Sequence, residues 1–244
     1  MSLVSRPGDA PHNVARIADC LALAAEKDIG LVVFPESCIG GYGSMAKLHR
    51  AELDALAEPL DGPSITVFDT AWGVRVGILI GGDNYLVENM RMTALMGATL
   101  LIAPHRSDGA NRTGNCRTQP GSMEQSLRRW LPARAGDNGM FVVFSEGGAI
   151  DDPDQSSGAG MIIDPGGRML AESSARDALI SADLDSELID ASAGQQWLTA
   201  RRPELYGLLT RPGHQATDFE PRSVSSRGAI ALSFAQVSRN RPIR

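Results

Sequence analysis

The 244-residue chain is poor in lysine, aromatic residues and cysteine, and it carries no excess of positive charge. Its 23 Lys and Arg residues stand against 29 Asp and Glu residues, so the formal net charge is −6. A protein of that charge repels phosphate backbones and anionic membrane surfaces, and we therefore expect neither nucleic acid nor a membrane as a partner. No apolar run approaches the roughly 18 residues of a membrane span, and the first twenty residues contain no apolar signal core.

The cysteines are few, and their spacing excludes two kinds of site. Cys20, Cys38 and Cys116 are odd in number and form no closely spaced pair, which is typical of a reducing compartment and predicts a cytoplasmic protein. Cysteine and histidine show no metal-ligand spacing, so we expect no metal. The glycines do not match the phosphate-binding fingerprints, and we expect no cofactor.

What remains is an ordinary globular composition, 43% hydrophobic and 21% charged, in which helical and strand-like segments alternate. This alternation predicts a layered α/β fold. We expect helices over 12–28, 44–57, 85–95 and 122–138, and strands over 31–34, 74–80, 99–103, 140–145, 159–163, 168–172 and 179–183. The last three strands suggest a meander or a second sheet.

For two of these helices we also predict which residues face the sheet or cap the helix. The first has Val14, Ile17, Leu21 and Ala24 at three- and four-residue spacing, which predicts that this stripe faces the sheet. The helix over 85–95 is expected to have Asp83 or Asn84 as its N-cap, because Asp and Asn side chains accept hydrogen bonds from free helical N–H groups.

Glu36 follows the predicted strand 31–34 and Pro35, in the region where α/β folds gather catalytic groups. A carboxyl group that is partly desolvated there has a raised pKa and can act as a general base near pH 7. The alternative is an ordinary loop glutamate with no catalytic role.

Two further strand ends carry candidate pocket residues. Gly81, Gly82 and Asn84 follow the strand over 74–80, where free N–H groups could stabilise a developing negative charge, although a glycine pair is also simply a tight turn. His105 follows the strand over 99–103 and is either a pocket residue or a polar loop residue.

Taken together, a series of short segments in this order resembles the nitrilase superfamily of carbon-nitrogen hydrolases. The resemblance covers residues 8–210. The segments that carry it are Gly8-Asp9, 31–36 with Gly41-Tyr42, 76–80 with Asp83, Glu88 and Arg91, Pro104-His105, 130–135 with Asn138-Gly139, 163–168 and 200–206.

The resemblance implies an αββα sandwich that usually dimerises, and a Glu/Lys/Cys triad that hydrolyses nitriles, amides or carbamoyl groups through a thioester. In such a triad the Glu takes the thiol proton, and the Lys stabilises the charge of the tetrahedral intermediate. Glu36 matches the family's general base.

The chain departs from this pattern at two of the three catalytic positions. The residue aligned with the nucleophilic cysteine is Gly81, and no lysine follows Lys47, which lies in the helix after Glu36 rather than in the family's later loop. The first strand and the interval between Glu36 and Gly81 are also shorter than in the family, so we expect a truncated sandwich.

These observations predict a carbon-nitrogen hydrolase-like domain over 1–210 and a C-terminal extension over 211–244. The expected function is that of an amidase, nitrilase or carbamoylase acting on a small molecule, impaired by the loss of the nucleophile and therefore a pseudoenzyme candidate, and forming a homo-oligomer. The alternative is a non-catalytic nitrilase-like protein that binds a ligand or another subunit. Substitution of the nucleophile by Cys38 or Cys116 would require a nearby base and an oxyanion site.

Overall fold

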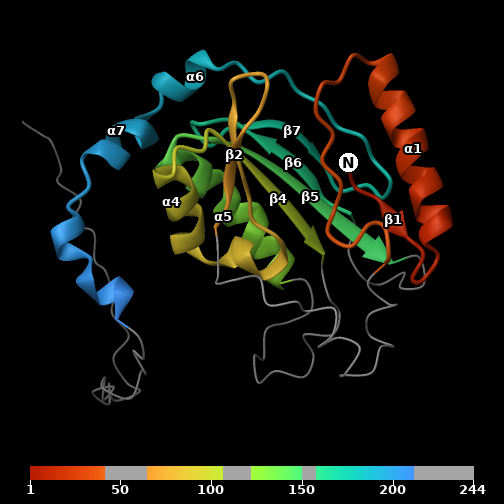
Figure 1. The fold of residues 1–244 in the computed structure, drawn as a ribbon, viewed down its shortest axis with the longest axis horizontal. Coiled ribbons are helices and arrows are strands. Elements are labelled where there is room, and N and C mark those ends of the chain that lie inside the picture. Colours follow the sequence, from red (N-terminus) through yellow and green to blue (C-terminus); the bar gives the residue numbers. More distant parts are fainter. Residues whose placement is uncertain (42–64, 107–121, 150–157, 212–244) are drawn as a thin grey trace, which may run out of the picture. The chain divides into compact units, whose positions relative to one another are not determined.

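The computed structural model describes residues 1–41, 65–106, 122–149 and 158–211 (Figure 1). The chain divides after Arg201 into two units. The described part of the second unit holds two short 3-10 helices, η2 (Pro203–Leu205) and η3 (Gly207–Thr210). The predicted domain boundary after residue 210 stays a prediction. The predicted helix 44–57, Tyr42, Lys47, Cys116 and most of the C-terminal extension lie outside the described residues.

The first unit is built on one mixed sheet, which is the only sheet in the described part of the chain. Its central strands β3, β4 and β5 are parallel, and β2, β6 and β7 join the edges antiparallel, so β5, β6 and β7 form a meander. Of the three strands predicted for a meander or second sheet, 159–163 and 168–172 correspond to β6 and β7, and 179–183 is not part of the sheet. A short strand, β1 (Val4–Ser5), pairs with the end of β5. The strands are β2 (Val67–Asp69), β3 (Arg75–Ile78), β4 (Leu100–Arg106), β5 (Phe141–Ala149), β6 (Gly160–Ile163) and β7 (Met169–Ser173).

Two predicted strands do not form. Residues 31–34 and 179–183 join no ladder in the structure. Val33 is buried as predicted, but its carbonyl accepts a hydrogen bond from the Met1 amino group instead of from a neighbouring strand. β-branched residues favour an extended backbone, whereas a strand also needs a partner in register, and a sequence pattern does not reveal that partner.

The first helix, α1 (Ala10–Glu26), buries only part of the predicted stripe. Ala24 is buried as predicted, whereas Val14 and Leu21 are 49% and 46% exposed, and Asn13 and Cys20 are buried in their place. The Asn13 side chain accepts from the Arg6 N–H at 2.8 Å and donates to the carbonyls of Arg6 and Ile39. These bonds make burial of a polar side chain favourable, and a hydropathy pattern cannot anticipate them.

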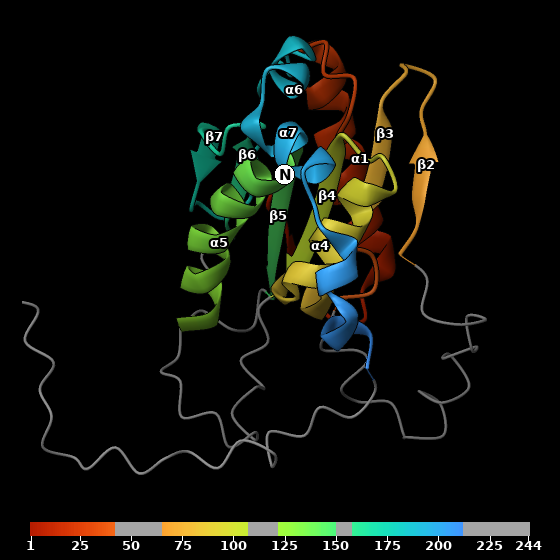
Figure 2. The same ribbon diagram turned by 90° about the vertical axis from the view of Figure 1, so that its left-hand side faces the viewer.

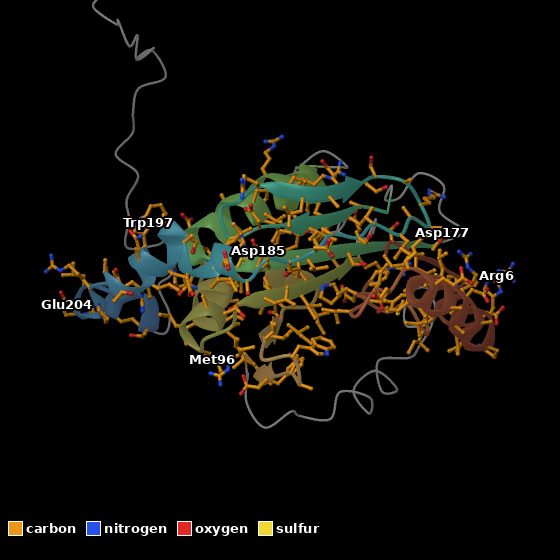
Figure 3. All side chains as sticks on the ribbon, turned by 90° about the horizontal axis from the view of Figure 1, so that it is seen from above. Arg6, Met96, Asp177, Asp185, Trp197 and Glu204 are labelled. Atoms are coloured by element: carbon orange, nitrogen blue, oxygen red, sulfur yellow. The ribbon has the colours of Figure 1, made fainter. Side chains whose placement is uncertain are left out.

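Asp177, which follows β7 in the sequence, binds residues of both α1 and β1. Its Oδ1 accepts a hydrogen bond from the Val4 N–H at 2.9 Å and lies 3.0 Å from the Arg16 guanidinium of α1. Figure 3 shows Asp177 at the same end of the sheet as α1. The N-cap of α1 is Asp9, whose side chain accepts from the His12 N–H.

The helices α4 (Val87–Leu95) and α5 (Ser122–Asn138) cover one face of the sheet (Figures 1 and 2). The core between them and the sheet includes Met90 of α4, Leu131 of α5 and Val142 of β5, all fully buried. Each such side chain contributes roughly 1.5–3 kcal/mol to folding. Two further short helices, α6 (Glu187–Asp190) and α7 (Ala193–Thr199), follow the meander.

The predicted N-cap of α4 is wrong. Residues Gly81–Tyr85 first form a 3-10 helix, η1, and the residue that caps α4 is Leu86. The side chain of Asn84 bonds to backbone carbonyls instead of helical N–H groups, as described below. In the part of the chain that the structure describes, no helix is both long and apolar enough to cross a bilayer.

Candidate functional site

Glu36 lies directly after an extended segment that ends at buried Pro35. Pro35 can approach the sheet closely because its neighbour on β5 is Gly147: a Cβ on Gly147 would lie 2.9 Å from the Pro35 Cβ. The residue after Glu36, Ser37, has a φ of 56°, so the chain turns sharply there. Glu36 itself is half-buried, and its carboxylate is held at the edge where β3 ends.

Gly81 lies against this carboxylate. A Cβ built on Gly81 would be 2.7 Å from Glu36 Oε2, 3.0 Å from Oε1 and 3.1 Å from Cδ. The structure therefore brings together the two residues that the sequence singled out as general base and substituted nucleophile position. The carboxylate group occupies the space in which a side chain at position 81 would begin.

The backbone at Gly81 adds a second constraint. Its φ is +54°, a conformation that costs a residue with a Cβ about 1–2 kcal/mol. A strained turn of this kind between a strand and a helix can expose a nucleophile, which glycine does not provide. A cysteine at this position would need Glu36 to move aside, and a carboxylate at the end of a flexible side chain can do so.

Asn84, predicted as a pocket residue, is instead part of the framework of this turn. It is fully buried, and its Nδ2 donates to the carbonyls of Leu79 at 2.9 Å, Gly81 at 3.3 Å and Pro104 at 3.3 Å. These three carbonyls belong to the end of β3, the turn itself and β4. Asn84 Oδ1 has no hydrogen-bond partner among the described residues.

Arg134 of α5 supports the same turn from the other side. Its guanidinium donates to the carbonyl of Asn84 at 2.7 Å and to that of Tyr85 at 3.0 Å, and lies 5.5 Å from the centre of the Trp130 ring. Burial lowers the pKa of Arg134, with the nearby Glu88 acting in the opposite direction. The sequence offered Arg134 only as part of a family-like segment and gave no sign of this role.

His105 is buried beneath the turn and does not line an open pocket. It belongs to β4, which runs three residues beyond the predicted strand end at 103, and only 4% of it is exposed. Its Nε2 lies 3.2 Å from the Tyr85 hydroxyl, and the two rings meet edge to face. His105 thus lies within β4 and packs against the turn, so the predicted loop position is wrong.

Gly82, the remaining predicted pocket residue, is exposed next to the Glu36–Gly81 contact. A Cβ on Gly82 would meet no atom within 4 Å. The neighbouring Asp83 is also exposed, and its carbonyl and carboxylate accept weak hydrogen bonds from Asn89. A side chain at position 82 would therefore meet no steric conflict.

The two described cysteines are free thiols. Burial raises the pKa of Cys38, although backbone hydrogen bonds oppose the shift, and burial also raises the pKa of Cys20 in α1. A raised pKa keeps a thiol protonated and a poor nucleophile near pH 7. Lys27, at the end of α1, is the single lysine in the described ranges.

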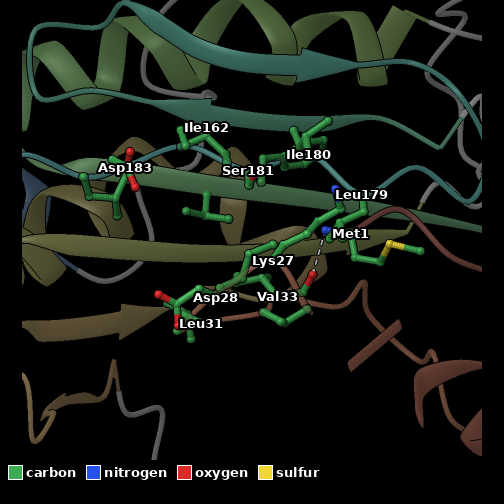
Figure 4. A pocket seen from close by; sticks show the side chains of 17 residues that line it. Met1, Lys27, Asp28, Leu31, Val33, Ile162, Leu179, Ile180, Ser181 and Asp183 are labelled. Atoms are coloured by element: carbon green, nitrogen blue, oxygen red, sulfur yellow. Dashed lines mark hydrogen bonds between the residues drawn. The ribbon is translucent and has the colours of Figure 1, made fainter. Parts of the chain in front are cut away.

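A cavity of about 390 Å³ lies away from this site, between the segments 27–33 and 179–184 (Figure 4). Val143 of β5 and Ile162 of β6 form part of its wall. None of the predicted site residues lines it. Within the described ranges, no three His, Cys, Asp or Glu residues cluster in a way that could hold a metal ion.

Comparison with known proteins gives a consistent family. A model of the carbon-nitrogen hydrolase family matches residues 53–193. An (R)-stereoselective amidase from a Pseudomonas species is 26% identical over 276 residues, covering 86% of this chain and 93% of the amidase. A protein from Pseudomonas protegens described as a hydrolase in the pqqF 5' region is 31% identical over 140 residues, covering 57% of this chain and 45% of that protein.

Solved structures of an amidase from Nesterenkonia sp. AN1, a member of the nitrilase superfamily, share the fold. One, with the acetamide moiety of fluoroacetamide added covalently at the active site cysteine, has a TM-score of 0.64 at 20% identity, covering 84% of this chain and 93% of that one. Another, in complex with butyramide, has a TM-score of 0.58 at 21% identity, covering 84% and 94%. These likenesses confirm the predicted nitrilase-type fold.

The alignment with the Pseudomonas amidase also bears on the predicted truncation. It extends over 276 positions, which is more than the 244 residues of this chain. The amidase therefore contains residues that have no counterpart here, in agreement with a shortened version of the fold.

Proposed function

Because this chain belongs to the carbon-nitrogen hydrolase family, we propose that it is an amidase-type member that binds a small amide, nitrile or N-carbamoyl compound beside Glu36 but cannot form a thioester there. The observation that supports the proposal is that the Glu36 carboxylate lies beside Gly81, 2.7 Å from where a Cβ would be, at the position that the family uses for its nucleophile. Glycine offers no atom that can attack a carbonyl or nitrile carbon. The pathway through a covalent intermediate is therefore closed at this position.

The chemistry that remains at the site belongs to Glu36. A positioned carboxylate can accept a proton, and general-base catalysis of this kind contributes roughly 10²–10⁴-fold to a rate. Loss of a covalent nucleophile typically costs several orders of magnitude in rate. Turnover of an unactivated amide should therefore be far slower than in a family member with a cysteine.

The substrate class is inferred from relatives. The Pseudomonas relative is named for stereoselective amide hydrolysis, and the Nesterenkonia amidase has been seen in complex with butyramide and with acrylamide. Small aliphatic amides are therefore the first compounds to test. Nitriles and N-carbamoyl compounds follow from the same family chemistry.

The cellular setting and assembly are part of the same proposal. An odd number of cysteines supports a cytoplasmic location, and the family resemblance supports a homo-oligomer. Light scattering coupled to size-exclusion chromatography measures the assembly directly. A mass equal to one chain over a wide range of protein concentration would contradict the oligomer.

The decisive experiment compares ammonia release from butyramide by four proteins: the parent, Gly81→Cys, Gly81→Ala and Gly81→Cys/Glu36→Gln. We expect almost none from the parent and a measurable gain in Gly81→Cys that disappears when Glu36 is also replaced. Gly81→Ala is the matched control, because it adds the same Cβ without a nucleophile. Rapid ammonia release by the parent would refute impairment.

A non-catalytic binding protein is the second candidate, and the same Gly81 contact favours it. It predicts that butyramide binds the parent in calorimetry while Gly81→Cys releases no ammonia. Ammonia release by Gly81→Cys would show that the site keeps its catalytic geometry, and it would contradict this second candidate. Absence of both binding and activity would contradict both candidates.

A further inference from the structure

The Glu36 carboxylate lies directly beside the place where a side chain at position 81 would start. A Cβ on Gly81 would be only 2.7 Å from Oε2. We propose that this chain hydrolyses activated carboxylic esters, such as aryl acetates, by a route that uses no thiol and in which Glu36 activates water. This inference rests on the proposed function, because it uses the same site.

The geometry supports direct attack by water. In a family member with a cysteine, the side chain at position 81 carries the nucleophile, whereas here a Glu36 carboxylate oxygen lies 2.7 Å from where a Cβ at that position would be. Glu36 is half-buried, and a general base acts effectively when it reaches the proton it removes directly or through one water. Gly82, the neighbour of Gly81, is exposed, so this side of the turn faces outward.

The turn that carries Gly81 is also held rigidly. Asn84 donates to carbonyls on both sides of it, and Arg134 donates to the carbonyls of Asn84 and Tyr85. A fixed backbone preserves the position of the acyl group relative to Glu36 without a covalent link. Such positioning is the contribution that the fold still makes after loss of the nucleophile.

The chemistry balances without a further reactant. Glu36 accepts a proton from water as the water oxygen forms a bond to the ester carbonyl carbon. The tetrahedral intermediate then collapses, the bond between carbon and aryl oxygen breaks, and the aryloxide leaves as an anion. Glu36 returns its proton to the aryloxide or to solvent, leaving a carboxylic acid and a phenol.

The leaving group explains why esters are favoured over amides. An amine must be protonated before it leaves, so an amide needs an acid placed beside its nitrogen, whereas an aryloxide departs unaided. The site would therefore separate the two substrate classes much more strongly than a thiol-dependent amidase does. This difference is itself measurable.

The test is hydrolysis of p-nitrophenyl acetate by the full chain in which Cys20, Cys38 and Cys116 are replaced by alanine or serine. We expect this cysteine-free protein to keep the parent rate, and the further change Glu36→Gln to lower it by about 100-fold. The rate should rise with ionisation of one carboxyl group and show a normal solvent deuterium isotope effect. Circular dichroism and thermal unfolding check that both variants remain folded.

Three results would overturn the inference: loss of activity in the cysteine-free protein, an unchanged rate in Glu36→Gln, or no hydrolysis above that of buffer. None of these three results by itself contradicts the proposed function. Calorimetric binding of butyramide to the parent, together with ammonia release by Gly81→Cys, would sustain the proposed function even if ester hydrolysis were absent. If butyramide does not bind and Gly81→Cys stays inactive, the proposed function fails regardless of the ester result.

Discussion

The carboxylate of Glu36 lies so close to Gly81 that a Cβ on the glycine would be 2.7 Å from Oε2 and would require the glutamate to move. The two residues are far apart in the sequence; Gly81 follows β3, and Pro35, just before Glu36, packs against Gly147 of β5. This contact decides what the site can and cannot do. It also makes position 81 a sensitive probe of the whole turn.

Gly81→Ala should lower the free energy of unfolding by about 1–3 kcal/mol, measured by urea denaturation. Its Cβ meets the Glu36 carboxylate, and its φ of +54° is unfavourable for alanine. Gly82→Ala is the matched control, because a Cβ there meets no atom within 4 Å. Equal effects of the two substitutions would show that the contact with Glu36 is not present in solution.

Asn84→Ala should destabilise the protein by about 2–3 kcal/mol, because it removes the donor to three backbone carbonyls and leaves a cavity. Asn84→Asp should be no better, since a carboxylate cannot donate to a carbonyl. Asn89→Ala serves as control: its hydrogen bonds to Asp83 are long and exposed, and its loss should cost less than about 0.5 kcal/mol. A tolerated Asn84→Ala would contradict the framework role of this side chain.

The hydrophobic pattern of the sequence predicted the central strands correctly, because these strands form where apolar side chains are buried. Val76, Leu101 and Val142 lie in short apolar runs, and each is buried in a parallel strand at the centre of the sheet, as predicted. Hydropathy was misleading where hydrogen bonds determine burial. Asn13 is buried and Val14 exposed because the amide of Asn13 binds backbone groups of Arg6 and Ile39, both outside α1.

The same distinction applies to the site. The family resemblance pairs Glu36 and Gly81 as general base and substituted nucleophile position, and the structure brings them together although the strand predicted before Glu36 does not form. Their catalytic roles stay predictions. The roles of Asn84 and Arg134 could not be predicted, because both bind backbone carbonyls whose positions exist only in the folded chain. The chemistry that a side chain can perform is easier to infer from the sequence than the backbone groups that it will bind.

Asp164 provides a test of the turn between β6 and β7. Its fully buried carboxylate accepts from the N–H groups of Gly166 and Arg168, at 2.8 and 2.9 Å, and from the Arg168 side chain at 2.6 Å. Asp164→Ala should cost about 2–3 kcal/mol in urea denaturation, because two backbone donors lose their acceptor.

Arg168→Ala is the control for that variant, since the Arg168 side chain is largely exposed and an ion pair with such a partner contributes about 1 kcal/mol or less. Asp164→Asn should be intermediate, because it keeps an oxygen for the backbone N–H groups. If Arg168→Ala proved as damaging as Asp164→Ala, the ion pair rather than the backbone bonds would hold the turn.

The thiol of Cys38 should react slowly with a disulfide reagent at pH 8, because burial raises its pKa. The double variant Cys20→Ala/Cys116→Ser isolates this thiol, and its reaction rate measured against pH should show a midpoint above that of the same protein unfolded in urea. Folding then favours the protonated thiol, so the free energy of unfolding should fall as pH rises from the unfolded pKa towards the folded one. A midpoint at or below the unfolded value would mean that Cys38 is an activated thiol, and it would reopen the assignment of Cys38 as a substitute nucleophile.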